Sequence, residues 1–518
     1  MCMLVKTYAS AVYGVDARTI TVEVHMGGSI QPHMNAFHLV GLPDNAIKEG
    51  YQRIMAALQN VGRKMPRKKI VVNLAPADIR KEGSAFDLPI AIAMLASANL
   101  IPAHALEDCV MMGELSLDGT IRPIKGALPI AIQARKEGFS NLIVPKANAK
   151  EAAIVNRLNV YGVEDLEEAI HIMEGGQMEA VKVDTRSHFS QTTGKYDLDF
   201  SDVKGQEKIK RALEIAAAGG HNVILIGPPG AGKTMLARRL PSILPRLNLT
   251  EALETTKIHS VAGCIQAEGS LLVQRPFRSP HHTISDVALV GGGSNPHPGE
   301  ISLAHNGVLF LDELPEFKRS VLEVLRQPME ERKVTISRAR ISVDYPASFM
   351  LIASMNPCPC GYYNHPEKEC QCGAGLVKRY LNKISGPLLD RIDLHVEVTP
   401  VSYNELAGEH RAKEESSSVR ERVQAARELQ YQRFKGQNFY SNAQMPGQAL
   451  RDHCRLSKAS MTMLRNAMEK LQLSARAYDR ILKVSRTIAD LEGETDIQAA
   501  HLAEAIHYRS LDRANWVE

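Results

Sequence analysis

The first third of the chain alternates two hydrophobic patterns. From residue 1 to about residue 174, strand-like runs such as "TITVEV" and "KIVVNL" alternate with helix-like runs such as "ALPIAIQARKEG". This order predicts an α/β or α+β domain. The most apolar stretch, "LPIAIAMLASANLI" from Leu88, is too short to span a bilayer and predicts a buried helix.

The pattern then changes twice. Residues 175–198 lose apolar periodicity and gain polar residues and glycine, which is typical of a linker. A second α/β pattern covers residues 199–400, where short apolar strands each meet a turn containing Gly, Asp or Asn. Residues 401–518 are mainly helical by pattern. The sequence therefore predicts an α/β multidomain protein with a helical C-terminal region.

The second region contains a nucleotide-binding signature. "NVILIGPPGAGKTMLARRL" combines an apolar strand, a glycine-rich turn and a helix, and its turn fits G-x-x-x-x-G-K-[ST]. In such a turn backbone N–H groups surround phosphates, the Lys reaches the β and γ oxygens, and the hydroxyl binds Mg²⁺. The predicted nucleotide-binding residues are Gly227, Pro228, Pro229, Gly230, Ala231, Gly232, Lys233 and Thr234.

Two further apolar strands end in polar residues. "GVLFLDELPEF" delivers Asp312, a candidate Mg²⁺ ligand with Thr234, and Glu313, a candidate for orienting or deprotonating the attacking water. "FMLIASMN" delivers Asn356, whose amide can sense the γ-phosphate. Alone, each of these polar residues is typical of an ordinary strand end or turn. They become catalytic candidates because a phosphate-binding turn, or P-loop, precedes them at residues 227–234.

Two arginines are candidate transition-state cations. Phosphoryl transfer builds up negative charge that a guanidinium can neutralise. Arg391 lies in "GPLLDRIDLHVEV" and Arg476 in "LSARAYDRILKVSRTIADL". For any single arginine, a solvated or salt-bridged surface position is the alternative.

The order of these motifs carries a family resemblance. The successive motifs "FSDVKGQE", "GPPGAGKT", "LFLDEL", "ASMN", "LLDRIDLHV" and "SARAYDRIL" resemble the AAA+ ATPases and, in detail, the magnesium-chelatase-like branch that includes the ComM family. The resemblance covers essentially the whole chain and implies an αβα P-loop core with a helical lid. By position it implies Walker A for Lys233 and Thr234, Walker B for Asp312 and Glu313, sensor 1 for Asn356, an arginine finger for Arg391 and sensor 2 for Arg476. Since a finger acts on a neighbour's nucleotide, it also implies a ring, a homo-hexamer.

Two inserts bear on the substrate. The first, rich in Gly and His and including His281 and His282, resembles the helix-2 insert of this branch, and we expect loop structure rather than a metal site there. The second, "KVTISRARISVDYP", reads as two alternating strands with Arg338 and Arg340 near the turn. It resembles the pre-sensor-1 hairpin of MCM-type helicases, whose basic tip grips DNA phosphates. Merely solvated arginines are the alternative.

Four of the eight cysteines cluster after Asn356. Cys358, Cys360, Cys370 and Cys372 form two C-x-C pairs nine residues apart. Four thiolates in a reducing compartment are a competent tetrahedral Zn²⁺ set, and similar sequences of the ComM family carry such a cluster here. The C-x-C spacing departs from the usual C-x-x-C and admits His365 as a substitute ligand. A redox-sensitive cluster and no joint role stay open.

The N-terminal region resembles the proteolytic domain of Lon in "KEGSAFDLPIAIAMLAS" and "GELSLDGTIRPIKGALPIAIQARKEG". The position of Lon's nucleophilic Ser falls on Ala85, and that of its Lys falls on Leu128. Without a hydroxyl and an amine there, no Ser–Lys acyl transfer is possible, unless Ser84 and Lys125 act in a shifted register. We therefore expect a Lon-protease-like domain over residues 1–174 that serves as a scaffold or binds DNA.

Charge and composition narrow the partners. The formal net charge is only +4, so that any argument for DNA has to be local. One basic run, "RKMPRKK" from Arg63 to Lys69, is either a phosphate contact or a solvated face. The start of the chain lacks the apolar core of a signal peptide, so we expect a cytoplasmic protein without a membrane partner.

The leading hypothesis is an ATP-driven, hexameric DNA motor that promotes branch migration in homologous recombination, such as the integration of incoming DNA. Its expected partners are single-stranded and branched DNA and recombination proteins. Its expected cofactors are ATP, Mg²⁺ and a structural Zn²⁺. The alternatives are a chelatase-type ATPase subunit that remodels a protein partner and, more weakly, an ATP-dependent protease.

Overall fold

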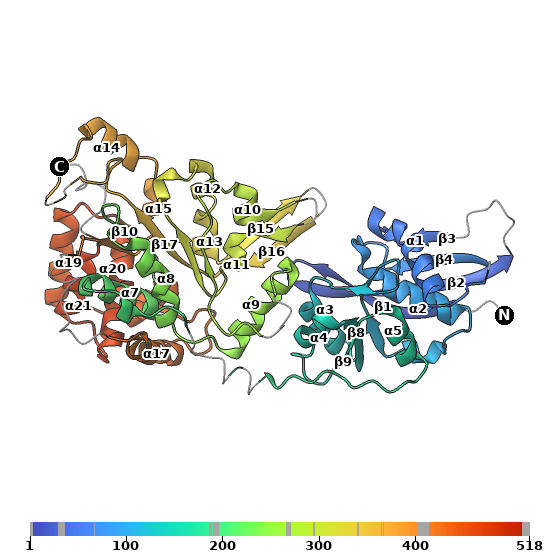
Figure 1. Ribbon diagram of the computed structural model, residues 1–518. Coiled ribbons are helices and arrows are strands. Elements are labelled where there is room, and N and C mark those ends of the chain that lie inside the picture. The colour runs from blue at the N-terminus through green and yellow to red at the C-terminus, as the bar shows by residue number, and fades with distance from the viewer. Residues whose placement is uncertain are drawn as a thin grey trace. The chain divides into compact units, whose positions relative to one another are not determined.

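A computed structural model of the chain describes residues 4–29, 37–66, 68–185, 189, 196–265, 271–293, 296–338, 341–363, 365, 367–401 and 414–509. The chain divides into two compact units (Figure 1). Unit 1 comprises Met1–Gln191 and Ala252–Leu272, and unit 2 comprises Thr192–Glu251 and Val273–Glu518. A short segment from the second α/β region of the sequence therefore belongs with the N-terminal unit.

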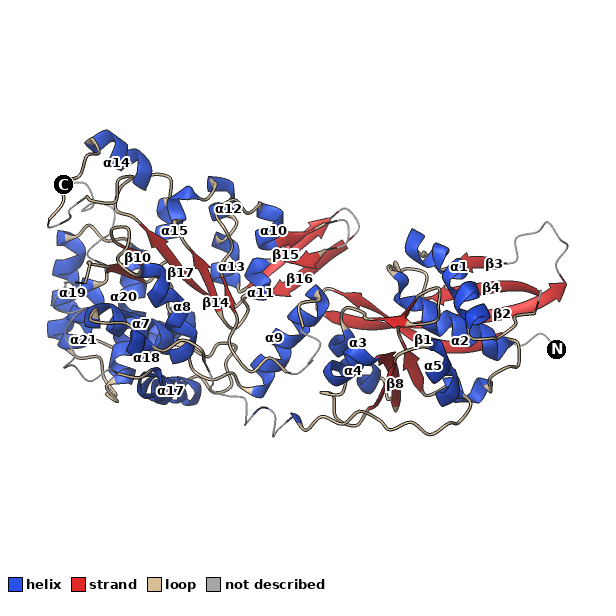
Figure 2. Ribbon diagram, in the orientation of Figure 1, coloured by secondary structure: helices blue, strands red, loops and turns tan. Residues whose placement is uncertain are grey.

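Unit 1 is built on a mixed seven-stranded sheet, seen as red arrows in Figure 2. Its strands, in spatial order, are β3 (Phe37–Val40), β4 (Lys68–Ala75), β2 (Asp16–Ser29), β1 (Leu4–Tyr13), β5 (Cys109–Met111), β8 (Asn141–Pro145) and β9 (Asn159–Val163). The pairs β1–β2 and β2–β4 are antiparallel, and the other neighbours are parallel. The predicted α/β or α+β character of this region is confirmed.

The helices of unit 1 follow the helix-like runs of the sequence. They are α1 (Asn45–Asn60), α2 (Asp87–Ser97), α3 (Ala127–Lys136), α4 (Lys146–Ala152) and α5 (Leu166–Met173), and a small hairpin of β6 (Glu114–Leu115) and β7 (Ile121–Arg122) lies between α2 and α3 in the chain. Every residue of α2 is buried. A helix that is apolar on all sides belongs inside a protein, and the buried helix predicted from Leu88 is confirmed.

Unit 2 contains a five-stranded parallel sheet. Its order is β11 (Phe277–Arg278), β14 (Val308–Leu311), β17 (Met350–Met355), β10 (Val223–Ile226) and β18 (Leu394–Glu397). Strands β10, β14 and β17 are buried along their whole length. Strands of a parallel sheet covered on both faces read as continuous apolar runs, which is why "VILI", "VLFL" and "MLIASM" were visible in the sequence.

Helices surround this sheet and continue into the C-terminal region (Figure 2). Those before and between the strands are α7 (Glu207–Gly219), α8 (Lys233–Ile243), α10 (Asp286–Val290), α11 (Glu300–Leu303), α12 (Arg319–Glu323), α13 (Arg326–Glu331), α14 (Ala374–Leu381) and α15 (Gly386–Leu389). Helix α9 (Leu249–Ala262) also falls between them in the chain, but from Ala252 onward it belongs to unit 1. The C-terminal helices are α17 (Ser416–Arg433), α18 (Gly447–His453), α19 (Lys458–Lys470), α20 (Ala475–Leu491) and α21 (Ala499–His507). Because α17 and α20 pack on α7, the helical region and the sheet share one hydrophobic core.

Two hairpins complete the description of unit 2. One joins β12 (Gly291–Gly292) and β13 (His297–Pro298), and the other joins β15 (Lys333–Arg338) and β16 (Ile341–Pro346). In β15, Val334 and Ile336 are buried while Thr335 and Ser337 are exposed, so the predicted alternating hairpin is confirmed. None of the helices in the described ranges combines the length and apolar character that a membrane crossing requires.

Candidate functional site

The P-loop joins β10 to α8. A Cβ atom at Gly227 would lie 2.2 Å from the carbonyl oxygen of Val398, so that only glycine fits where β10 ends. Gly232 has a φ of +84° and immediately precedes Lys233, the first residue of α8. The turn therefore leads into a helix N-terminus, where free backbone N–H groups and the helix dipole favour phosphate.

The ammonium group of Lys233 lies inside this turn. Its Nζ donates hydrogen bonds to the carbonyl oxygens of Gly227 at 2.7 Å and Pro228 at 2.9 Å, and to Oδ1 of Asn356 at 3.0 Å. Burial lowers the pKa of Lys233, while the carboxylates of Asp312 and Glu313 oppose that shift. The structure thus brings Lys233 and Asn356 together from different strands of the sheet.

Asp312 lies at the end of β14, between two hydroxyl groups. Thr234 Oγ1 donates to its Oδ2 at 2.7 Å, and Ser354 Oγ donates to its Oδ1. Hydroxyl and carboxylate oxygens are the ligands that Mg²⁺ prefers, so Thr234 and Asp312 would hold the ion that accompanies a nucleotide. Sequence reasoning missed Ser354, although its place two residues before Asn356 put it on the same strand end.

Glu313 has a different environment from Asp312. Its side chain is 58% exposed, and its backbone adopts a φ of +54°. Its Oε2 lies 3.9 Å from Nδ1 of His282, whose ring lies 4.0 Å from that of His281, centroid to centroid. Glu313 is therefore open to water. His281 and His282 lie in the irregular segment and turn before α10, so the expected loop structure is confirmed.

Arg391 lies at the other end of the sheet. It precedes β18, whose Leu394 pairs with Val223, the first residue of β10, whereas the P-loop follows the last. Its side chain is 7% exposed, donates to the carbonyl oxygen of Pro387 at 2.6 Å and forms an ion pair with Glu330 at 2.6 Å. The structure therefore does not bring Arg391 to the P-loop of its own chain.

Arg476 lies near Arg391. It stands in the first turn of α20, and its side chain is 55% exposed. Its Nη1 is 3.8 Å from Oδ2 of Asp390, the residue next to Arg391. Both candidate arginines are thus on the amino-terminal side of β18, apart from Lys233, Thr234, Asp312 and Asn356.

A buried polar group fixes this edge of the sheet. Asp393 is ionised between Arg480 of α20, with Nη1 2.9 Å from its Oδ1, and the ring of His221, 3.5 Å from its Oδ2. Arg480 and Asp393 form an ion pair, but Oδ1 of Asp393 accepts no hydrogen bond from the described residues. Burial alone would raise the pKa of Asp393, but Arg480 and His221 hold it well below the usual range. Asn222 adds its backbone N–H to Asp393 and donates its amide to the carbonyl oxygen of Arg391.

The four clustered cysteines come together as the sequence predicts. Their sulfur atoms all lie within 4.8 Å of one another, and three of the separations are 3.3, 3.7 and 3.6 Å. A tetrahedral Zn²⁺ with Zn–S bonds of about 2.3 Å holds its sulfurs about 3.8 Å apart, so this set fits the ion. A hydrogen bond from the backbone N–H of Tyr362 lowers the pKa of Cys360 to about 6. His365 instead accepts from the backbone N–H groups of Glu367 and Lys368, and so is not part of this set.

Comparisons with known proteins agree with this site. The family description "Magnesium chelatase, subunit ChlI" matches residues 199–406, "Subunit ChlI of Mg-chelatase" matches residues 22–148, and "Magnesium chelatase, subunit ChlI C-terminal" matches residues 413–509. Competence protein ComM of Haemophilus influenzae is 46% identical over 98% of this chain and 97% of its own length. The chain belongs to the ComM/YifB family of magnesium-chelatase-like proteins.

Other relatives agree with this membership. Uncharacterized protein YifB of Escherichia coli is 45% identical over 98% of this chain and 97% of its own length. The magnesium-chelatase 38 kDa subunit of Cereibacter sphaeroides is 25% identical over 32% of this chain and 54% of its own length. The resemblance inferred from the order of the motifs is thereby confirmed, and it supports ATP binding at the P-loop.

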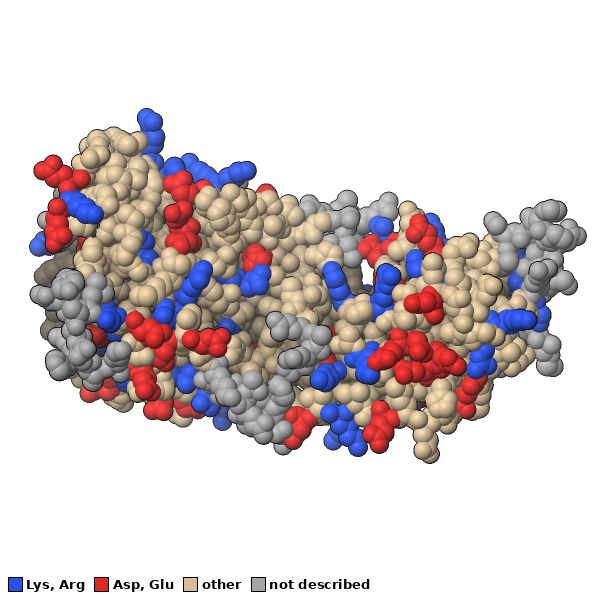
Figure 3. Space-filling view, viewed as in Figure 1, with Lys and Arg blue, Asp and Glu red and all other residues tan. Residues whose placement is uncertain are grey.

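The candidate DNA contacts are less well defined. Arg338 ends β15, but its side chain is not described, and Arg340 lies outside the described residues, as does Arg67 of the basic run. Lys68 and Lys69 of that run are exposed at the start of β4. On the face drawn in Figure 3, Lys and Arg are interspersed with Asp and Glu. Because charges of both signs alternate among the described residues drawn there, bulk charge does not point to a DNA-binding face.

Unit 1 carries no Ser–Lys dyad in its described residues at the Lon-like positions. Leu128 is fully buried, and Ala85 has no nucleophilic atom. The hydroxyl of Ser84 donates to the carboxylate of Glu114 rather than to an amine. The side chain of Lys125 lies instead beside Gly263. The alternative of a shifted dyad thus finds no support in these contacts.

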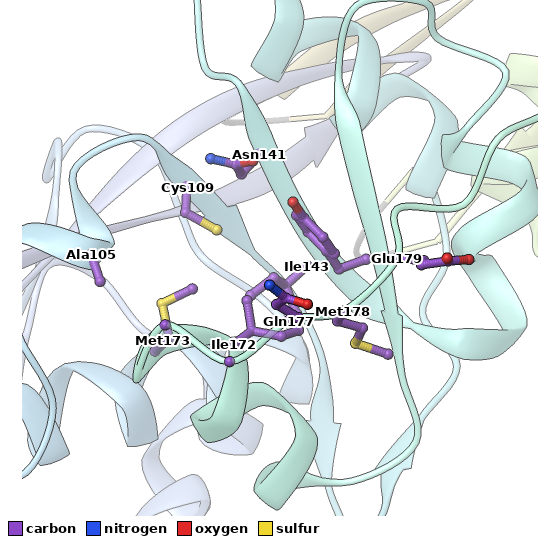
Figure 4. A pocket seen from close by; sticks show the side chains of 12 residues that line it. Ala105, Cys109, Asn141, Ile143, Ile172, Met173, Gln177, Met178 and Glu179 are labelled. Carbon is purple, nitrogen blue, oxygen red and sulfur yellow. The ribbon is translucent and has the colours of Figure 1, made fainter.

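A pocket of about 690 Å³ opens in unit 1 (Figure 4). Its walls include Ile143 of β8, Met173 of α5 and the segment with Met178 and Glu179. Cys109 faces it, but burial raises the pKa of that thiol to about 12. A buried, protonated thiol is a poor nucleophile, so the pocket offers no evident covalent chemistry.

Proposed function

We propose that the chain is an ATP-hydrolysing AAA+ motor that forms a hexameric ring around DNA and promotes branch migration during homologous recombination. The Haemophilus influenzae relative is named Competence protein ComM, which supports a role in the uptake and integration of DNA. Single-stranded and branched DNA and recombination proteins are the partners in this proposal.

One observation carries the proposal of a ring. Lys233 and Asn356 meet at the carboxyl edge of the parallel sheet, whereas Arg391 and Arg476 lie at its amino edge. A guanidinium acts on a phosphoryl group only in direct contact. Arginines placed at the opposite edge suit the nucleotide of a neighbouring subunit, and a head-to-tail contact of this kind forms a ring when the rotation between subunits closes.

In this proposal the residues of the P-loop divide the work of hydrolysis. Lys233 neutralises charge on the β and γ oxygens, and Thr234 with Asp312 holds Mg²⁺. Glu313, which is exposed, orients and deprotonates the attacking water, and Asn356 positions the γ-phosphate. Water activation and charge neutralisation thereby come from different residues.

The cysteine cluster is proposed as a structural Zn²⁺ site. The mutual closeness of the four sulfurs supports this, and a structural site uses all four positions for protein ligands. The proposal presupposes a reducing compartment such as the cytoplasm, because oxidised cysteines do not bind the ion. Contact with DNA is assigned to Arg338 and Arg340, and a Lon-protease-like fold of unit 1 is proposed to act as a scaffold.

A chelatase-type ATPase that remodels a protein partner is the second candidate. The 25% identity with the magnesium-chelatase 38 kDa subunit favours this candidate. That similarity spans only 32% of this chain, whereas the similarity to Competence protein ComM spans 98%. We therefore prefer the DNA motor.

The deciding experiment measures ATP hydrolysis with and without single-stranded and three-way-junction DNA, together with displacement of a labelled strand. Lys233→Ala serves as the blank. Stimulation by DNA with ATP-dependent strand movement is expected. Hydrolysis that is indifferent to both DNAs would contradict the motor and favour the remodelling ATPase.

A further inference from the structure

The cysteine loop is attached to the nucleotide site at its beginning. Cys358 is fully buried and stands two residues after Asn356, whose amide oxygen accepts from Lys233 at 3.0 Å. Fixing the backbone at Cys358 therefore also restrains the backbone at Asn356, two residues earlier. A ligand that orders the four thiols also orders the residue that contacts the P-loop lysine.

A second attachment lies within the loop. Gly361 is buried, has a φ of +84° and follows Cys360 directly. A Cβ atom at Gly361 would lie 2.4 Å from Cδ and 3.2 Å from Cγ of Pro229 in the P-loop. The proline ring is rigid and part of the backbone, so it cannot swing away as a long side chain does. The backbone of the cysteine loop therefore rests directly against the phosphate-binding turn.

A third attachment follows the last cysteine. Helix α14 begins two residues after Cys372 and carries the buried Tyr380. Burial raises the pKa of Tyr380, and the backbone N–H of Asn356, which is close to the Tyr380 hydroxyl, opposes that shift. The loop is thus tied to the nucleotide site before, within and after its two C-x-C pairs.

We propose that the cysteine loop positions the P-loop through Gly361, so that metal bound to the four thiols sets the affinity of the site for nucleotide. The inference rests on the proposed Zn²⁺ site and adds a role to it. A metal that merely stabilised a distant subdomain would raise stability without changing nucleotide binding. Here the metal-bound loop is one wall of the P-loop, and Gly361 is a positioning residue.

The loop offers a matched pair of variants. Gly361→Ala places a methyl group against Pro229 at a left-handed backbone conformation. Gly373→Ala changes a glycine next to Cys372 that has an ordinary φ of −63° and no neighbouring atom within 4 Å of the added carbon. Both leave all four cysteines in place, so a difference between them reports the constraints on Gly361, namely its left-handed backbone and its contact with Pro229.

The experiment uses the full-length protein and three readouts: bound zinc by mass spectrometry, the Kd of a fluorescent ATP analogue, and the shift of Tm on adding ATP. We expect about one zinc per chain in the wild type and in both variants. We expect Gly361→Ala and zinc-stripped wild type to bind the analogue about tenfold to a hundredfold more weakly. Their ATP-dependent Tm shift falls accordingly, while Gly373→Ala matches the wild type.

The possible failures are distinguishable. Absence of zinc from the purified, reduced wild type would refute the metal site and with it the metal dependence. Zinc-loaded Gly361→Ala that binds nucleotide like Gly373→Ala would refute the positioning role, and the metal site would stand. Unchanged Kd after removal of zinc would likewise overturn the coupling, whatever the zinc content.

Discussion

At the scale of single residues, the orientation of Asp312 rests on two hydroxyl groups. Thr234 contacts one carboxylate oxygen and Ser354 the other. A buried donor such as Ser354 fixes which oxygen lone pairs remain available for Mg²⁺. Mutation of a group that holds a metal ligand in this way typically lowers metal affinity or activity about 10- to 100-fold.

We predict that Ser354→Ala lowers ATP turnover about ten- to a hundredfold, because Asp312 loses the hydroxyl that orients it. Part of the loss should be recovered at high Mg²⁺. Steady-state hydrolysis as a function of Mg²⁺ concentration tests this. Ser354→Thr keeps the hydroxyl and should be close to the wild type, and Ser337→Ala, on the exposed face of β15, controls for loss of a serine. Wild-type turnover in Ser354→Ala would remove this serine from the site.

At the scale of elements, helix α20 is joined to the sheet through Asp393. Arg480 of α20 pairs with this carboxylate, and His221, at the end of the turn after α7, lies on its other side and meets Thr487 of α20 at 2.8 Å. The same helix begins with Arg476. The buried pair therefore determines where the exposed arginine stands.

We predict that Arg480→Met destabilises the protein by about 3 to 5 kcal/mol near neutral pH, because it leaves Asp393 charged and buried without its partner. Urea unfolding followed by circular dichroism measures this. Lys333→Met is the matched control, since the Lys333–Asp344 pair is half exposed and solvent screens its attraction. Equal losses in the two variants would contradict the prediction.

The sign of the pH dependence follows from the low pKa of Asp393. In the wild type its contribution to stability is fully present above the unfolded pKa of about 4 and is lost as the pH falls below that value, since the unfolded chain binds the proton first. Without Arg480, burial raises the pKa of Asp393 instead, and protonation relieves the unpaired charge. The difference in stability between wild type and Arg480→Met should therefore narrow from pH 7 towards pH 5.

The hairpin of β15 and β16 gives a second prediction for an element. We expect Arg338→Ala combined with Arg340→Ala to keep basal ATP hydrolysis and to lose its stimulation by DNA, because phosphate contacts at a tip carry the coupling to DNA. Lys333→Ala removes a positive charge from the base of the same hairpin and serves as the control. Equal stimulation by DNA in the double variant would exclude the hairpin from the mechanism.

At the scale of the whole molecule, each active site of the proposed ring combines residues of two neighbouring chains. We predict that Lys233→Ala and Arg391→Ala are both inactive alone and recover activity when mixed. In a random ring of equal parts, about a quarter of the sites pair an intact P-loop with an intact arginine. ATP hydrolysis after mixing the subunits measures this. Lys233→Ala mixed with Asn356→Ala should stay inactive, because both changes damage the same site.

The nucleotide site and the family can be predicted from the sequence. Buried parallel strands are continuous apolar runs, and the phosphate-binding turn needs small residues at fixed spacing, so both are local signals. Lys233, Thr234, Asp312 and Asn356 were therefore predicted one by one, and the structure brings them together. The two C-x-C pairs were predicted in the same way, and their sulfurs meet.

Contacts between residues that are distant in the chain are visible only in the folded structure. It added Ser354 to Asp312, set Arg391 and Arg476 on the edge opposite the P-loop, and placed Gly361 against Pro229. It also assigned Ala252–Leu272 to the N-terminal unit. None of these contacts leaves a local sequence pattern, because the sequence around a serine, an arginine or a glycine does not indicate which distant residue it contacts. Only the packing of strands and loops that are remote in the chain fixes those neighbours.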